Sequence, residues 1–317
     1  MTTAIDSSKS IFDGVQPVTL CTPDPGVAIE LYTVGLGFRA LPPVLLPAEP
    51  WRELWDLPAG GDLTVTDLVK EGAHGGGIRI VQAPELPVLQ GGRLPDVGGP
   101  YAWDFYVRDM DRAIERLREM GWGLRSEPQR YRLFGQDFEV LECMLEGPQG
   151  LLHALVEYIP NRHRCVLAQD DRHEVSEVIA TVFVVPSIAE PLKAMTAGLG
   201  ADVAMDEVFA GPEIEALLDL PVGSSFRMAL MRGPTRRSAR FELLESIAGP
   251  QASPLEGSWP HVIAPMPVSN PAASAAAMLE CGAVVRESRS SALSGAIRVD
   301  LAPGVKLLLV SEDFALT

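Results

Sequence analysis

An internal repeat constrains the fold of this chain more than any other feature of its sequence. The segment 18–60 matches the segment 181–223 at a constant offset of 163 positions, without a gap. The triplet Gly-Leu-Gly, for example, stands at 35–37 and again at 198–200. A gapless match of this length is not expected by chance, so the C-terminal half repeats the N-terminal half.

A weaker match relates the second quarter of the chain to the fourth. The segment 109–121 reads like 270–282, and each is a short helical pattern that ends in glycine. The apolar segment 150–156 likewise resembles 304–310. Four similar units follow, which we call modules 1 to 4: 15–85, 98–160, 176–248 and 259–314.

Every module has the same order of predicted elements. A β-branched run comes first, then a one-sided helix stopped by glycine, then several strand-like runs. One helix cannot cover both faces of a sheet of three or four strands, so the modules must pair. We therefore expect a tail at 1–14, an N-terminal domain at 15–160, a polar linker at 161–175 and a C-terminal domain at 176–317.

The charge of the chain bears on its partners. The 317 residues carry a formal net charge of −16. An acidic surface repels nucleic acid and anionic membranes, so neither is an expected partner. The polar stretch 1–13 has no signal-peptide core, and no stretch reaches the roughly 18 apolar residues of a membrane span.

The cysteines bear on the cellular compartment. They are scattered along the chain without a CxxC pair, at Cys21, Cys143, Cys165 and Cys281. This spacing argues against a structural zinc site and against a disulfide framework. Reduced thiols are the simplest account, so we expect a cytoplasmic protein.

The repeat unit resembles the βαβββ module of the vicinal oxygen chelate superfamily, the group of glyoxalases, bleomycin-resistance proteins and extradiol dioxygenases. The resemblance rests on the segment 24–38, with an acid, a helix and then Leu-Gly-Phe, and on the closing strand 240–245. It implies an α+β fold, in which four modules pair into two glyoxalase-type domains whose curved mixed sheets form cups. The reaction stays open, because the superfamily includes lyases, isomerases, dioxygenases, thiol transferases and drug-binding proteins.

The resemblance also implies where a metal would bind. Metal-dependent members carry a His or Gln near the start of the first strand and a Glu on the last strand. At these positions only His261 and Glu242 suit a metal, and three protein ligands are usual for a catalytic ion. We therefore expect no metal cofactor, with a divalent ion held by His261 and Glu242 as the less favoured alternative. The other positions carry residues that suit a metal poorly or not at all: Gln16, Pro17, Arg79, Pro100–Ala102, Ala154, Ile179, Ala180 and Leu308.

Three residues are candidates for catalysis. His261 opens the first strand of module 4, and Glu242 lies on the closing strand of module 3, so we expect both to line one C-terminal cup. Tyr106 shares a strand face with Asp104, opposite to Trp103 and Phe105. If the polar pair faces the cup, Tyr106 is a proton donor; if the aromatic pair does, the cup binds a flat ligand.

Five further residues are candidates for substrate binding. Arg79 stands at the repeat position of Glu242 and could hold a substrate carboxylate or phenolate. Lys306 could pair with Glu242 across the same cup. The tryptophans at the predicted cup rims could stack on a planar ligand: Trp51, Trp55 and Trp259.

The leading functional hypothesis is a metal-independent lyase or isomerase that acts on a small oxygenated, aromatic molecule. Acid/base work would fall to His261 and Glu242. One alternative is a small-molecule or drug-sequestering protein of the bleomycin-resistance type. The other is a metal-dependent enzyme resembling dioxygenases or glyoxalases. The expected partner is a small-molecule substrate, and a homodimer stays open.

Overall fold

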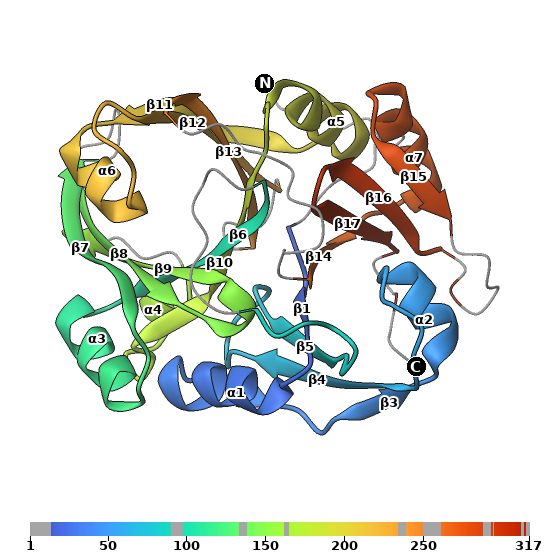
Figure 1. Ribbon diagram of the computed structural model, residues 1–317, viewed down its shortest axis with the longest axis horizontal. Helices are drawn as coiled ribbons and strands as arrows, with labels where there is room; N and C mark the ends of the chain where they lie inside the picture. Colours follow the sequence, from blue (N-terminus) through green and yellow to red (C-terminus); the bar gives the residue numbers. More distant parts are fainter. Residues whose placement is uncertain are drawn as a thin grey trace.

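Two curved β-sheets, each flanked by helices, make up the computed structural model (Figure 1). The α+β class and the four modules that the repeat predicts are confirmed. Among the described residues, no helix is long and apolar enough to span a membrane. The structure describes residues 14–89, 98–132, 138–161, 165–233, 239–249, 261–287, 293, 295–311 and 314.

The elements follow the predicted ranges, except that the first strand of module 3 begins at Val175, one residue before its expected start. Module 1 contains β1 (Val18–Thr22), α1 (Pro25–Glu30), η1 (Leu31–Gly35), β2 (Arg39–Ala40), β3 (Val44–Leu46), α2 (Ala48–Leu54), β4 (Leu63–Val69) and β5 (Ile78–Gln82). Module 2 contains β6 (Gly99–Val107), α3 (Met110–Glu119), β7 (Leu124–Arg132), β8 (Glu139–Glu146), η2 (Pro148–Gly150) and β9 (Leu152–Ile159). A short helix, α4 (Val166–Gln169), lies in the linker.

Modules 3 and 4 repeat this order. Module 3 contains β10 (Val175–Val184), α5 (Ala189–Leu199), β11 (Asp202–Ala210), α6 (Pro212–Leu218), β12 (Ser225–Arg232) and β13 (Arg240–Ala248). Module 4 contains β14 (His261–Pro267), α7 (Pro271–Glu280), β15 (Val284–Glu287), β16 (Ile297–Ala302) and β17 (Val305–Val310).

The sheets are shared between the two halves of the chain. One sheet joins module 4 to module 1 in the order β15-β16-β17-β14-β1-β5-β4-β2, and the other joins module 3 to module 2 in the order β11-β12-β13-β10-β6-β9-β8-β7. The antiparallel pairs β1–β14 and β6–β10 make the two junctions. We call the concave faces the 1/4 cup and the 2/3 cup. The expectation of one C-terminal cup made by modules 3 and 4 is therefore wrong.

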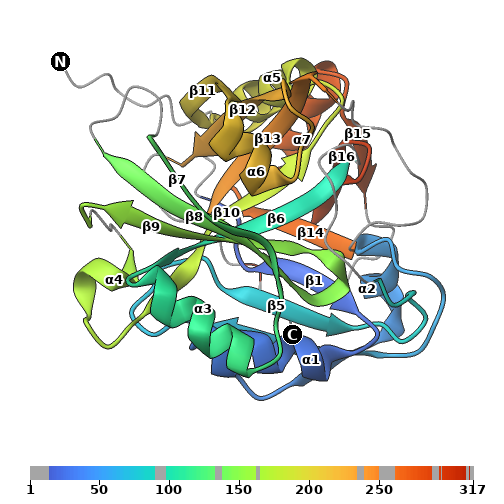
Figure 2. The same cartoon turned by 60° about the vertical axis from the view of Figure 1, so that its left-hand side comes forward.

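Helices, not strands, hold the two modules of each half together. In Figure 2, α1 and α3 lie together on one side of the molecule, and α5 and α7 lie together on another. Gly35 lies where η1 meets α3, and a Cβ there would come within 3.0 Å of Leu117. Its repeat partner Gly198 faces α7, where a Cβ would overlap with Met278. The first glycine of each Gly-Leu-Gly triplet thus permits a close helix crossing.

The second glycine of each triplet ends the helical segment. Gly37 and Gly200 have φ of 70° and 65°, in the left-handed region that suits glycine. Side chains cap the starts of α3 and α7. The Asp109 side chain accepts a hydrogen bond from the Arg112 amide, and the Asn270 side chain accepts one from the Ala273 amide. These caps explain why the helices begin and end where the glycine and acid pattern predicts.

One apolar core fills the space between the helices and the convex faces of both sheets. Trp103 and Phe105 of β6 lie in it with Phe183 and Phe241 of module 3. Strand alternation then directs the neighbours Asp104 and Tyr106 to the concave face. The polar pair of β6, and not the aromatic pair, therefore faces the cup.

Candidate functional site

The 1/4 cup is occupied in part by its own helix α2, and a space of about 310 Å³ remains beside this helix, lined by Asp56, His261 and Lys306 among others. Helix α2 places Trp51 and Trp55 inside the cup, and their side chains are 3% and 1% exposed. The two indole rings lie 4.9 Å apart between centroids and pack with the apolar residues of β1 and β14. The expectation that these tryptophans lie at a cup rim is wrong, because both are buried in an apolar cluster inside the cup, which we call the α2 plug.

The 2/3 cup keeps an internal space. Its α6 is the repeat of α2, but Ile214 and Leu218 stand where α2 carries Trp51 and Trp55. These smaller side chains close the cup without filling it, and a cavity of about 110 Å³ remains, room for several water molecules. An ion pair of 2.6 Å between Arg125 on β7 and Asp219 holds the end of α6 against module 2.

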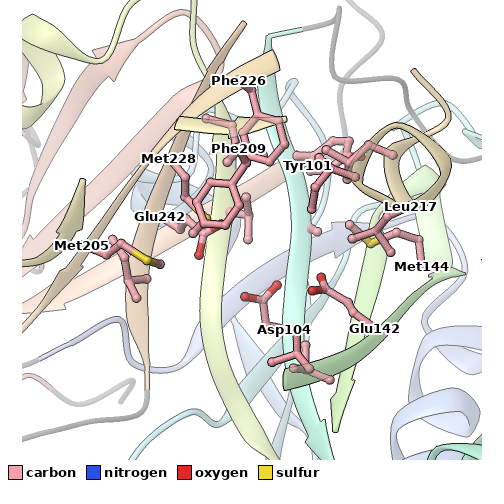
Figure 3. A pocket seen from close by; sticks show the side chains of 18 of the residues that line it. Tyr101, Asp104, Glu142, Met144, Met205, Phe209, Leu217, Phe226, Met228 and Glu242 are labelled. Carbon is pink, nitrogen blue, oxygen red and sulfur yellow. The ribbon is translucent and has the colours of Figure 1, made fainter. Parts of the chain in front are cut away.

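Most of the cavity wall is apolar. Phe209 and Phe226 stack with their centroids 5.5 Å apart, with Met205 and Met228 on their side of the cavity and Met144 across it (Figure 3). The remaining apolar lining comes from both modules: Ala102, Val140, Val156, Val182, Ile214, Leu217, Leu218, Leu230 and Leu244.

Three carboxyl groups interrupt this wall, and we call Asp104, Glu142 and Glu242 the carboxyl cluster. They come from three different strands, β6, β8 and β13, and all line the cavity. The cross-strand neighbours of Asp104 are Ala180 and Ala154, so small side chains leave room around its carboxyl group. In Figure 3 the carboxyl groups of Asp104 and Glu142 turn toward one another.

The three carboxyl groups of the cluster have raised pKa values. Burial raises the pKa of Glu242 to about 8, with Glu142 adding to the rise and Arg240 opposing it. Burial, Glu242 and Glu142 raise the pKa of Asp104 well above its usual range. Burial raises the pKa of Glu142 to about 7, against the hydrogen bond that Tyr131 donates to it. Burial is the cause common to all three, because an apolar enclosure penalises the carboxylate form, and like charges add to the penalty for Asp104 and Glu242.

Arg240 provides the positive charge of the cavity. It lies two residues before Glu242 on β13 and faces the same cup. Its Nη2 donates to the Tyr106 hydroxyl at 2.8 Å, and that hydroxyl also bonds to the Tyr158 hydroxyl. Burial acts to lower the pKa of Arg240, but the two tyrosines, Asp104 and Glu242 raise it above its usual value. The guanidinium is thus charged and held within the protein.

Some polar atoms of the cavity have no protein partner. The Tyr101 hydroxyl is buried and makes no hydrogen bond in the described part of the chain, and the residue is 1% exposed. Within the same ranges, the carboxyl groups of Asp104 and Glu242 have no hydrogen-bond donor. A buried hydroxyl left unpaired is costly, so its partner is expected to come from outside the protein.

The structure separates His261 from Glu242. His261 begins β14 in the 1/4 cup, whereas Glu242 lies on β13 in the 2/3 cup, so the expected pair in one cup is wrong. His261 Nε2 lies 2.6 Å from the Trp55 carbonyl oxygen, at the edge of the α2 plug. Burial, together with Lys306, lowers the pKa of His261 to about 4. The ring is therefore neutral near neutral pH, and Nε2 donates to the carbonyl.

The expected pairing of Lys306 with Glu242 is also wrong. Lys306 lies on β17 in the 1/4 cup and forms an ion pair of 2.8 Å with Asp56. Arg79, the repeat partner of Glu242, bonds the carboxylate of Asp67 with both Nε and Nη2, at 2.7 and 2.9 Å. Both cations are thus neutralised inside the 1/4 cup.

Two other residues complete the description. Trp259, a predicted site residue, lies outside the described residues. The imidazole of His153 faces the convex side and stacks between Tyr32 and Phe105 in the core. Burial lowers its pKa to about 3, so it is a neutral core residue.

Several residues of the cavity are absent from the sequence-based candidates. Arg240 precedes Glu242 by two positions, so strand alternation alone could have placed it in the same cup. Glu142 alternates with the core-facing Leu141 and Cys143, so strand alternation could have placed it on the cup face as well. Tyr101 and Phe209 give no such indication, because an aromatic residue on a strand is as readily core as cavity wall.

The cavity lining does not suit the metal chemistry that the resemblance implies. It contains no imidazole and no thiol, and the cation Arg240 shares it. Among the described residues, no three His, Cys, Asp or Glu side chains are arranged to hold a metal ion. The residues present therefore do not fit the superfamily's metal site.

Comparison with known proteins supports the fold. No protein-family model matches the chain, and no curated protein matches it. Among solved structures, glyoxalase I from Zea mays superposes with a TM-score of 0.59 at 13% identity, covering 95% of this chain and 93% of that one. A mutant of the same enzyme gives a TM-score of 0.62 at 14% identity, with 96% and 94% covered. A candidate dioxygenase from Bacillus subtilis gives 0.59 at 14% identity, with 97% and 87% covered. Four βαβββ modules in two cupped sheets, together with these superpositions, show that the chain has the fold of the vicinal oxygen chelate superfamily.

Proposed function

We propose that this chain is an enzyme, a lyase or isomerase that moves a proton on a small substrate inside the 2/3 cup. The observation that carries the proposal is the carboxyl cluster, whose pKa values are raised toward neutrality in an enclosed cavity. A general acid or base works best when its pKa lies near the working pH. Glu242 stands where metal-dependent members carry a ligand, but the proposal uses it as an acid or base together with Asp104 and Glu142.

The cluster supplies both partners of a proton transfer. At neutral pH it holds fewer charges than carboxyl groups, because like charges in an apolar site cannot all ionise. The ionised member takes a proton from a substrate atom, and a protonated member gives its proton to another atom of the same substrate. The proton count of the enzyme is unchanged after one turnover, so an isomerisation needs no co-reactant. Glu242 and Asp104 suit these roles because neither has a hydrogen-bond donor among the described residues.

Deuterium exchange tests the proposal even while the substrate is unidentified. The protein is incubated in D₂O with a library of small metabolites, and mass spectrometry detects compounds that gain deuterium. We expect exchange with at least one compound, and the rate should fall by roughly 10²- to 10⁴-fold in Glu242→Gln. The variant Glu213→Gln is the matched control, because Glu213 is exposed on α6 and outside the cavity. Exchange that persists in the double variant of Glu242→Gln and Asp104→Asn would contradict the proposal.

The deuterium-exchange experiment also tests in which of the two cups the proton transfer takes place. If His261 were the catalytic base, His261→Ala would abolish the exchange. We expect it to leave the exchange unchanged, because His261 lies in the other cup and its Nε2 bonds the Trp55 carbonyl.

A sequestering protein is the second candidate. The observation that favours it is the lining of phenylalanines and methionines, which adapts to apolar ligands without specifying a reaction. A compound that binds the cavity and shows no exchange under any condition would support this candidate over the enzyme.

A further inference from the structure

We propose that the cavity of the 2/3 cup takes a small organic cation, a primary ammonium group on an apolar body about the size of one ring. The inference deepens the proposed function, since both place the ligand in this cavity. It concerns the ligand's charge, which the proposed proton transfer leaves open.

The charges of the cavity lining favour a cation. The carboxyl cluster provides three acids, and Arg240 is the one basic side chain among the described residues that line the cavity. Its guanidinium is already engaged by the Tyr106 hydroxyl at 2.8 Å and, more weakly, by the Ile179 carbonyl at 3.4 Å. An anionic ligand would meet three acids and a guanidinium that is already engaged. A cationic ligand would favour ionisation of a second carboxyl group, for which Arg240 provides no further counter-charge.

An unpaired buried hydroxyl points to a ligand independently of the acids. Tyr101 lines the cavity, and its buried hydroxyl has no hydrogen-bond partner in the described ranges. Asp104 and Glu242 also lack donors there. An ammonium group has three N–H donors and no acceptor, so it suits a wall that offers acceptors without donors.

The rest of the cavity wall indicates which chemical groups the uncharged part of the ligand contains. Figure 3 shows Phe209, Phe226, Met205 and Met228 on one side of the cavity, away from the facing carboxyl groups of Asp104 and Glu142. Aromatic faces and thioethers favour an apolar or aromatic group over a sugar or a phosphate. The ligand is thus charged at one end and apolar at the other.

A single positive charge is also consistent with the proposed proton transfer. Arg240 compensates one carboxylate and the ammonium compensates a second. The third carboxyl group is left without a counter-charge and keeps its proton near neutral pH. Ammonium binding therefore leaves one acid in the protonated form that proton donation needs.

Three probes of matched size test the inference by calorimetry near neutral pH: benzylammonium, benzyl alcohol and benzoate. We expect benzylammonium to bind at least ~10-fold more tightly than benzyl alcohol, since a charge-assisted hydrogen bond is stronger than a neutral one. Benzoate should show no binding. Equal affinity of benzylammonium and benzyl alcohol, tighter binding of benzoate, or no binding of any probe overturns the inference.

Substitutions in the carboxyl cluster test whether benzylammonium binds in the cavity. Asp104→Asn and Glu242→Gln should each weaken the affinity for benzylammonium by ~10-fold and leave the affinity for benzyl alcohol nearly unchanged. Glu213→Gln removes the same charge from the exposed face of α6 and should change neither affinity. If Glu213→Gln weakens benzylammonium as much as the cavity variants do, the effect is long-range attraction and the inference fails. The deuterium exchange stays a separate readout, so a cavity that prefers neutral ligands would leave the proposed function intact.

Discussion

At the scale of single residues, the chemistry of the cavity depends on where each acid lies relative to its neighbours. Glu242 is 8% exposed and shares its strand face with Arg240, yet burial outweighs this cation and raises the pKa of Glu242 to about 8. Arg79 stands at the same repeat position in module 1 and bonds Asp67 directly. One position of the repeat thus carries a paired cation in one cup and a carboxyl group without a donor in the other.

The raised pKa of Glu242 makes the stability of the fold depend on pH. The ordinary pKa is 4.5 and the folded value is about 8. Between these values the folded protein holds a proton that the unfolded chain has released, so stability falls as the pH rises through this window. Denaturant titrations from pH 5 to 8 should therefore show a decreasing free energy of unfolding.

Glu242→Gln should flatten this dependence. The amide has no proton to lose, so the variant should gain stability relative to the parent as the pH approaches 8. Asp104 and Glu142 also have raised pKa values, so part of the slope should remain. A variant whose slope equals that of the parent protein would show that Glu242 titrates normally.

Strand alternation predicts the residues of the site better than it predicts their grouping. It places Glu242 on a concave face, and it groups Asp104 with Tyr106 on one face without deciding which; the structure has all three in the cavity lining. It cannot say which strands hydrogen-bond across the two halves, because that pairing is a long-range contact. For this reason the sequence alone groups His261 and Glu242 in one cup.

At the scale of elements, the contrast between α2 and α6 decides where each cup has free space. Both helices follow the same repeat, and both are followed by an aspartate in the left-handed region, Asp56 and Asp219, with φ of 55° and 54°. Only the side chains that they direct inward differ. Two indoles occupy the interior of one cup and leave a space beside His261 and Lys306, while Ile214 and Leu218 leave the other cup with a cavity among its carboxyl groups.

Exchanging the inward side chains should exchange the properties of the cups. Leu218→Trp should fill the 2/3 cup and abolish binding of any cavity ligand, while the fold persists because the added volume enters an existing space. Calorimetry with the probes above and a thermal melt measure both effects. Undiminished binding would mean that the ligand site lies elsewhere.

The reverse change should be costly in the 1/4 cup. Trp55→Ala removes a side chain that is 1% exposed and leaves a void in the α2 plug. Truncations of this kind cost about 3–5 kcal/mol. Leu218→Ala borders an existing cavity and should cost less, which urea denaturation of the two variants can compare.

The helix crossings give a second contrast between repeated positions. Gly198→Ala places a Cβ against Met278 and within 3.2 Å of the Ser274 carbonyl oxygen, so it should destabilise by about 1–3 kcal/mol. Gly35→Ala meets side-chain atoms alone, at 3.0 Å from Leu117, 3.3 Å from Leu31 and 3.5 Å from Met120, and should cost less. Unfolding midpoints of the two variants check the order, and an equal loss would mean that helix α7 shifts freely.

At the scale of the whole molecule, each half of the chain completes the sheets of the other. The repeat predicts four modules and their order, since both are local properties of the sequence. It does not predict that β1 pairs with β14 and β6 with β10, because the junctions join segments more than 60 residues apart in the chain. Both cups are consequently built from two halves, although each half packs its own helices.

The two halves should therefore depend on one another for folding. A chain divided within the linker, between Asn161 and Cys165, would leave β1 and β6 unpaired in the first half and β10 and β14 unpaired in the second. Unpaired strands of this length associate, so each half alone should aggregate or form a dimer through these edges. Mixed or co-expressed halves should instead form a one-to-one complex that restores both sheets and binds the cavity ligand. Light scattering coupled to size exclusion measures the stoichiometry, and circular dichroism measures the regained structure. A first half that is monomeric and fully folded by itself would contradict this dependence, because it would have to cover β1 and β6 without their partner strands.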